Sequence, residues 1–156
     1  MVAEVSCVLG VDPGISGGIA FYFPQRPEHV VAEDMPVAGK EVDVGTLVAR
    51  IKQMHPAFAV IESVHSMPGQ GVASTFKFGM AYGAARAALT AMCVPVFLVA
   101  PTKWKKYHAL PADKEEARAL ALRLWPSVDC FERKKDHGRA EAALIARYGA
   151  EVIGHA

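Results

Sequence analysis

The sequence of 156 residues contains 52% hydrophobic and 21% charged residues, which is typical of a folded protein and excludes a disordered chain. This length predicts a single domain, residues 1–156, with one substantial core. The net charge of +1 indicates no partner by itself, but residues 101–139 contain ten Lys or Arg against six Asp or Glu. This local excess of positive charge favours a surface that binds a polyanion.

The first apolar stretch carries Glu4 and is broken by the turn at residues 12–14, so we expect neither a signal peptide nor a membrane span. An odd number of cysteines without metal-ligand spacing argues against a disulfide framework. The three cysteines are Cys7, Cys93 and Cys130. We therefore expect a reducing, cytoplasmic compartment and no membrane partner.

Buried apolar runs separated by turns predict strands, and apolar residues at helical spacing predict helices. The predicted strands are Val5–Val11, Gly18–Phe23, Val30–Met35, Ala57–Ile61 and Val94–Val99. The predicted helices are Asp43–Met54, Val72–Met92, Ala112–Trp125 and a last one from about Asp136 to Val152. Three strands followed by alternating helices and strands predict an α/β fold, with a mixed five-stranded sheet (antiparallel meander plus parallel strands) and helices on both faces.

Two predicted strands end in a carboxylate. Asp12 follows the first strand, and Glu62 follows the fourth, flanked by apolar residues. Because functional groups collect at the carboxyl ends of parallel strands, the two carboxylates face each other if their strands are neighbours. The alternative for Asp12 is a residue that caps the following turn.

The last helix adds a third acid. Glu141 recurs with Ile145 and Tyr148 at helical spacing, which places it either on the stripe facing the sheet or at the edge of that stripe, reaching solvent. Asp136 lies off that face; it either bends back over the first turn as a fourth acid or simply caps the helix. His137, four residues before Glu141, shares its face.

Several carboxylates that converge on one rim repel each other when ionised, and divalent cations offset that cost. Oxygen ligands without a Cys or His framework favour Mg²⁺ or Mn²⁺ over Zn²⁺. Two such ions about 4 Å apart can hold the attacking water and the leaving oxygen of a phosphodiester. The acids therefore predict a phosphoryl-transfer site, with Asp12, Glu62, Asp136 and Glu141 as catalytic residues and metal ligands.

The segments Val8–Gly18, Val60–Val64 and His137–Ala146 together resemble the RuvC-type Holliday junction resolvases. They occur in the order of that family, and the resemblance extends over nearly the whole chain. The chain looks most like the short bacteriophage or prophage relatives. The resemblance implies an RNase H-like fold, a homodimer, and paired nicks in a four-way DNA junction that depend on two Mg²⁺ or Mn²⁺ ions per active site.

Within this resemblance, Asp12 and Glu62 match the first two catalytic acids of the family, and Glu141 stands where the family usually has its final aspartate. The family commonly carries another acid, or a histidine, three residues before that final acid, where this chain has Gly138. We therefore expect Asp136 to serve as the fourth catalytic residue; the alternatives are His137 or a site with three acids.

The segment Pro101–His108 combines lysines with aromatic residues, which is typical of phosphate contacts. Trp104 within it either packs against DNA or lies in the core. Lys105 and Lys114 resemble the family's basic residues near the scissile phosphate, although Lys114 alternatively pairs with acids on its own helix. His65 stands where the family often has a stacking aromatic, and the basic pair at 134–135 alternatively serves solubility. The predicted DNA-binding residues are His65, Lys103, Lys105, Lys106, Lys114, Lys134 and Lys135.

The predicted function is therefore a structure-selective DNA endonuclease acting on four-way junctions, in recombination or repair. The alternative is a non-catalytic branched-DNA-binding protein on the same fold, motivated by Gly138. An actin-like or sugar-kinase-like ATPase would need a second similar domain, for which 156 residues leave no room. Gly79 and Gly83 in the long helix are explained by close packing within the fold, and the resemblance implies a dimer across this region.

Overall fold

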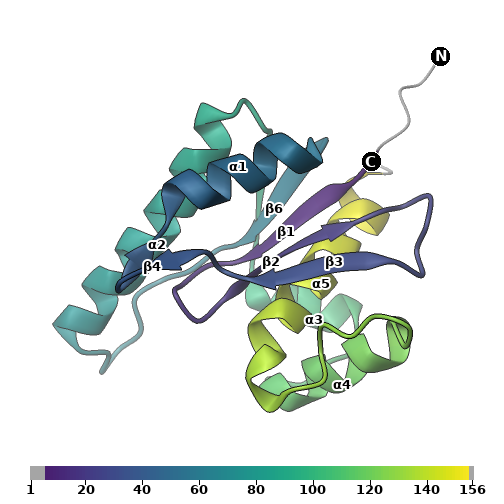
Figure 1. Cartoon of the computed structure of the whole chain (residues 1–156). Coiled ribbons are helices and arrows are strands. Elements are labelled where there is room, and N and C mark those ends of the chain that lie inside the picture. Colours follow the sequence, from purple (N-terminus) through teal and green to yellow (C-terminus); the bar gives the residue numbers. More distant parts are fainter. Residues whose placement is uncertain (1–5, 155–156) are drawn as a thin grey trace.

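The computed structural model describes residues 6–154 and is built on a five-stranded sheet in the order β3-β2-β1-β6-β7 (Figure 1). β1 pairs antiparallel with β2, and β2 with β3, whereas β6 is parallel to both β1 and β7. The strands are β1 (Val8–Asp12), β2 (Gly18–Tyr22), β3 (Val30–Asp34), β6 (Phe58–Glu62) and β7 (Val96–Val99). The predicted mixed sheet, with a meander followed by parallel strands, is confirmed. Val5, where the first strand was expected to begin, lies outside the described residues.

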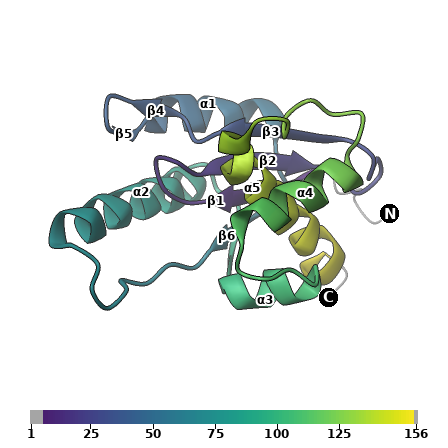
Figure 2. The same cartoon turned by 90° about the horizontal axis from the view of Figure 1, so that it is seen from below.

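Helices cover both faces of the sheet, as predicted (Figures 1 and 2). One face carries α1 and α2, and α5 lies on the other face with α3 and α4 around it. The helices are α1 (Val44–Met54), α2 (Val72–Ala91), α3 (Pro101–Tyr107), α4 (Lys114–Leu124) and α5 (His137–Tyr148). A short turn η1 (Lys134–Asp136) leads into α5, and a wider turn η2 (Gly149–Ile153) continues it. Within residues 6–154, no helix has both the length and the apolar character needed to cross a membrane.

The alternation of side chains along β1 and β6 decides which face receives their terminal acids. In β1, Val8 packs on the side of α5, whereas Leu9 packs on the side of α1 and α2. β6 alternates in the same way, and the two strands are paired in parallel up to the residues just before Asp12 and Glu62. Both acids therefore end neighbouring strands and point to the face that α5 covers.

Close contact between the backbone of α5 and the sheet depends on glycines. A Cβ atom at Gly10 would lie 2.1 Å from the carbonyl oxygen of Ala142, and one at Gly18 would lie 2.6 Å from that of Gly138. A Cβ atom at Gly138 would in turn lie 2.7 Å from the carbonyl carbon of Gly17. No side chain fits between these backbones, so α5 rests directly on β1 and β2.

One short helix and one small hairpin are missing from the sequence prediction. The helix α3 follows β7 directly, with Pro101 at its first turn, where a missing N–H group costs nothing. Its 7 residues are too few for apolar periodicity to indicate a helix. A small hairpin, β4 (Val37–Ala38) and β5 (Glu41–Val42), lies beside α2.

The explanation of Gly79 and Gly83 by close packing within the fold is wrong. A Cβ atom at either position would meet no described atom within 4 Å, because both glycines lie on the exposed face of α2. Glycine lowers helix stability by about 1 kcal/mol relative to alanine. The exposed face of α2 therefore contains two helix-destabilising residues for which the described chain provides no packing reason.

The contact between Gly138 and the turn before β2 predicts a stability difference between two matched substitutions. Gly138 and Gly45 both occupy the second position of a helix, but a Cβ atom at Gly45 would meet only a side-chain oxygen of Asp43, at 3.5 Å. Gly138→Ala is expected to lower the free energy of unfolding by about 1–3 kcal/mol through overpacking. Gly45→Ala should raise it by up to about 1 kcal/mol. Urea unfolding measures both values, and equal effects would contradict the close contact.

Candidate active site

The acids Asp12, Glu62 and Glu141 line one pocket of about 350 Å³ at the carboxyl ends of β1 and β6. The first two come from neighbouring strands and the third from α5, which the glycine contacts hold against those strands. The turn after β1, from Pro13 to Gly17, forms one wall of the pocket. The structure therefore brings together three of the four predicted catalytic acids.

Asp12 and Glu141 are the acids of the pocket whose carboxyl groups affect each other most strongly. Burial raises the pKa of Asp12 well above its ordinary value, and the carboxylates of Glu141 and Glu62 raise it further, against a smaller lowering by Lys114. Glu141 is 5% exposed, and its Oε1 atom has no hydrogen-bond partner among the described residues. A negative charge on Asp12 is unfavourable in these surroundings without a nearby cation, so the site favours binding of positive charge.

Glu62 has a partner that the sequence does not reveal. Nε1 of Trp104 in α3 donates a hydrogen bond to Oε2 of Glu62 over 2.6 Å. Burial raises the pKa of Glu62, while the bond from Trp104 opposes that rise. Trp104 is fully buried, so of its two predicted environments the core is confirmed.

Asp136 does not line this pocket. Its side chain is buried and accepts hydrogen bonds from the backbone N–H of Arg133 and from the Arg133 guanidinium, both over 2.8 Å. Burial alone would raise the pKa of Asp136, but these bonds and the charge of Arg139 hold it below its ordinary value.

The structure thus does not place Asp136, the predicted fourth catalytic residue and metal ligand, with the other three acids. Its carboxylate is already neutralised by Arg133, with Arg139 at 3.8 Å. The alternative that Asp136 simply caps the last helix does not hold either, because its side chain makes no capping hydrogen bond to α5. Asp136 is the last residue of the short turn η1 before α5, and its side chain closes that turn by bonding to Arg133.

His137 occupies the corner of the pocket that Asp136 was expected to fill. It is the first residue of α5 and lines the pocket, and its Nδ1 atom is buried without a hydrogen-bond partner in the described chain. It lies one turn before Glu141, on the same helix face. The absence of an acid at Gly138 has a steric reason, since that position contacts the backbone at Gly17.

Two of the predicted DNA-binding lysines, Lys105 and Lys114, line the same pocket as the acids. The alternative that Lys114 pairs with an acid of its own helix is not observed within residues 6–154, where Glu115 pairs with Arg118. Lys105 and Lys106 also line a second hollow, formed by α3 and the segment that follows it, residues 109–112.

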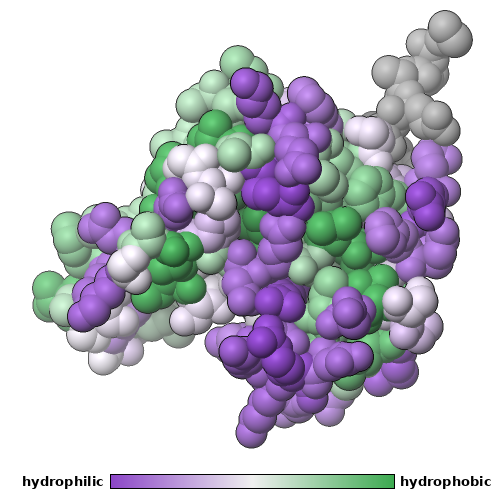
Figure 3. Space-filling view, in the orientation of Figure 1, coloured by the Kyte–Doolittle hydropathy of each residue, from purple (hydrophilic) through white to green (hydrophobic). Residues whose placement is uncertain are grey.

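The remaining predicted DNA-binding residues are exposed and line neither hollow, and their role stays a prediction. These residues are His65, Lys103, Lys134 and Lys135. Lys134 and Lys135 belong to η1. Hydrophilic side chains gather over α4 and the segment leading into α5, in the lower part of Figure 3.

The donors of the pocket suit a hard divalent cation, because carboxylate oxygens are the ligands that Mg²⁺ and Mn²⁺ prefer. The unpaired Oε1 of Glu141 and the crowded Asp12 are the groups whose electrostatic cost an ion would relieve. Among residues 6–154, no three His, Cys, Asp or Glu side chains already have the spacing of a metal site.

No protein-family model matches the sequence, and no curated protein matches it. Solved structures do match. T. thermophilus RuvC in complex with Holliday junction substrate has a TM-score of 0.70 and 22% identity, over 96% of each chain. A structure of Thermus thermophilus RuvC has a TM-score of 0.62 and 21% identity, over 95% of this chain and 96% of the other. The yeast mitochondrial Holliday junction resolvase Ydc2 has a TM-score of 0.54 and 17% identity, over 99% and 85%.

The sheet order and these likenesses define an RNase H-like α/β fold. Within that class, the chain has the fold of the RuvC-type Holliday junction resolvases, along nearly all of its length. The resemblance seen in three sequence segments is thereby confirmed at the level of the fold.

Proposed function

We propose that this chain is a metal-dependent, structure-selective DNA endonuclease that resolves four-way junctions by paired nicks. The observation that carries the proposal is the convergence of Asp12, Glu62 and Glu141 with Lys105 and Lys114 in one pocket. The fold of a RuvC protein seen with Holliday junction substrate supports branched DNA as the partner. An acidic site edged by lysines suits a phosphodiester, since it can take up cations and also neutralise the phosphate.

Each side chain of the pocket has a role in this proposal. Asp12, Glu62 and Glu141 would hold two Mg²⁺ or Mn²⁺ ions, which supply an activated water and stabilise the leaving oxygen. Lys105 and Lys114 neutralise the phosphate that enters the pocket. Nδ1 of His137 hydrogen-bonds to the attacking water or to a phosphate oxygen, because it has no other partner in the described chain.

Charge removal at the three acids tests the proposal. Asp12→Asn, Glu62→Gln and Glu141→Gln are each expected to lower Mg²⁺-dependent nicking of a synthetic four-way junction by about 100-fold or more. Junction binding should persist in a gel-shift assay, since none of these changes removes a lysine.

The matched control is Asp136→Asn, the same chemical change at an acid that Arg133 already neutralises. It should lower the melting temperature yet retain nicking wherever the protein is folded. An acid whose variant nicks at the wild-type rate would be removed from the site.

The observation that motivates the alternative function, a non-catalytic branched-DNA-binding protein, is the glycine at position 138. The close contact of Gly138 with the backbone at Gly17 explains that glycine, and His137 supplies a side chain to the pocket next to it. The same assay separates the two functions. Tight binding of the junction by the wild-type protein, with no nicking in either Mg²⁺ or Mn²⁺, would establish the alternative.

The hollow formed by α3 and residues 109–112 predicts a contact with the DNA backbone outside the catalytic pocket. Lys106 is exposed and lines that hollow but not the acidic pocket. Lys106→Ala should therefore weaken junction binding and reduce the slope of log affinity against log salt by about 1. Lys52→Ala, an exposed lysine of α1 across the sheet, is the control and should leave both unchanged. Identical slopes for Lys106→Ala and the wild type would exclude this contact.

We further propose that the chain works as a homodimer through the exposed face of α2. Phe76 is 67% exposed and Val72 is 89% exposed, and both lie on the same face as Gly79, Met80 and Gly83. Large apolar side chains next to unpacked glycines suit close approach of a second helix. A second copy is the partner that a symmetric junction with two symmetric cuts calls for.

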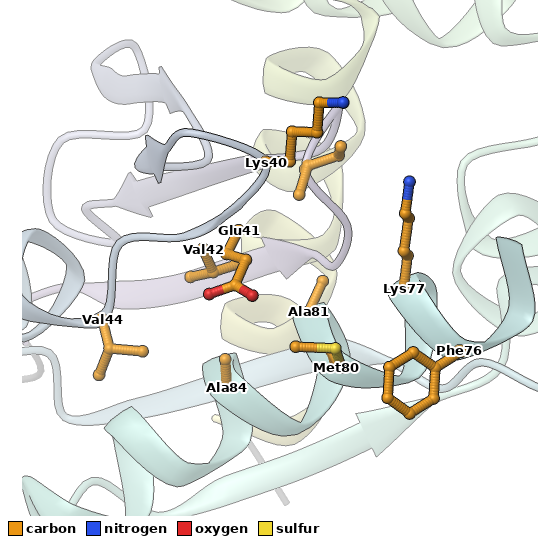
Figure 4. A pocket seen from close by; sticks show the side chains of 10 residues that line it. Lys40, Glu41, Val42, Val44, Phe76, Lys77, Met80, Ala81 and Ala84 are labelled. Carbon is orange, nitrogen blue, oxygen red and sulfur yellow. The ribbon is translucent and has the colours of Figure 1, made fainter. Parts of the chain in front are cut away.

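The same surface is hollowed beside the small hairpin. A groove of about 360 Å³ lies between β4–β5 and α2, with Phe76 and Met80 on its α2 side and Lys40 at its rim (Figure 4). Its apolar lining continues the face of α2 onto the hairpin through Val42 and onto the start of α1 through Val44. Apolar surface of this kind marks an interaction site more often than a solvated one.

Phe76→Glu tests the dimer. A charge at the centre of the proposed contact should shift the protein from dimer to monomer in sedimentation or light scattering, because it would be desolvated in the interface. Nicks should then become unpaired, so a cruciform plasmid accumulates nicked circles instead of linear product. Thr90→Glu, at the far end of the same helix, is the control. A wild-type protein that is monomeric on junction DNA would contradict this proposal.

A further inference from the structure

Trp104 is placed unusually for a buried aromatic residue. It is fully buried in the core on the α5 side of the sheet, yet its indole N–H ends at a carboxylate that lines the acidic pocket. The donor–acceptor distance of 2.6 Å is short for an N–H group and indicates a charge-assisted hydrogen bond. Trp104 itself is not among the lining residues, so it contacts Glu62 from behind.

The bond leaves the two oxygens of Glu62 in different environments. Oε2 accepts from Trp104, whereas no donor to Oε1 is found within residues 6–154. An indole N–H group can only donate, so it can neither ligate a metal ion nor take a proton from the site. It fixes the orientation of the carboxylate without competing for its ligands.

The end of the helix that carries Trp104 is bonded to α5 and to the turn η2 that continues it. Nε2 of His108, the residue after α3, lies 2.9 Å from the carbonyl oxygen of Leu144 in α5, and the hydroxyl of Tyr107 donates to Glu151 in η2. α5 also carries Glu141. The bond from Trp104 therefore fixes the position of the Glu62 carboxylate relative to that of Glu141.

We propose that Trp104 is a positioning residue, which holds Oε2 of Glu62 so that Oε1 is directed to the pocket as a metal ligand. This inference rests on the proposed metal-dependent function. Hydrogen bonds that orient a ligand are typically worth 10–100-fold in metal affinity or activity. The sequence offers no signal for this bond, because Trp104 and Glu62 lie 42 residues apart.

The chain provides a matched control in its other tryptophan. Trp125 is also fully buried in the same core, and its indole N–H donates to the carbonyl oxygen of Pro27 over 3.0 Å. Trp104→Phe and Trp125→Phe thus each remove one buried indole donor and similar volume. Only the first removes a donor to the acidic pocket.

Trp104→Phe is expected to raise the Mg²⁺ concentration for half-maximal nicking about tenfold, whereas Trp125→Phe leaves it within about twofold of wild type. Both variants should lower the melting temperature, so the Mg²⁺ response separates positioning from a purely structural role. A wild-type Mg²⁺ response in folded Trp104→Phe would overturn the proposal.

A second measurement needs no catalysis. The sequence has 2 tryptophans, so Trp104 is the sole tryptophan in the Trp125→Phe protein. Its fluorescence should change when Mg²⁺ is added and when Glu62→Gln is introduced, and Mg²⁺ should have little effect in the Gln variant. Unaltered emission with Glu62→Gln would overturn the inference. The two proposals can also fail separately. If the wild-type protein never nicks but the emission of Trp104 in the Trp125→Phe protein responds in this way, the proposed function is refuted, while the bond from Trp104 to a cation-binding Glu62 is retained.

Discussion

The direct contact between the backbone of α5 and the backbones of β1 and β2 is the constraint on which the rest of the structure depends. It exists because Gly10, Gly18 and Gly138 leave no side chain between the helix and the sheet. A helix held at ordinary side-chain distance would keep Glu141 several ångströms farther from Asp12. With that contact, three acids from distant parts of the sequence share one pocket, and the pKa of Asp12 rises because burial and the neighbouring carboxylates act together.

Ion pairs then fix the beginning of α5, where the histidine of the pocket lies. Arg139 pairs with Asp34 at the end of β3 over 2.8 Å and also donates to the carbonyl oxygen of Cys130. Arg133 closes the preceding turn on Asp136. Asp136 therefore serves the geometry of the site without lining it, and its bonds orient the turn from which His137 enters the pocket.

Much of the fold follows from patterns within the sequence. Apolar runs and helical spacing predict the meander, the parallel strands, their order along the chain and the helices on both faces, because strands and helices have different periods. Asp12 and Glu62 could each be predicted at the end of an apolar strand, but that these two strands pair is an observation of the structure. The short helix α3 and the hairpin β4–β5 escape such patterns because 7 residues, or 2 per strand, are too few to display a period.

The sequence by itself determined the acids at the strand ends and the basic segment after the last strand, and it placed Glu141 on the apolar stripe of the last helix or at its edge. The structure shows that Glu141 is buried and lines the pocket. Only the tertiary structure shows that Asp136 is paired with Arg133 and that His137 lines the pocket. It also decided the role of Trp104, whose partner is 42 residues away, and the need for glycine at position 138, which arises from a backbone 121 residues earlier in the chain. Contacts between distant segments leave no local periodicity, and packing alone decides which of them form.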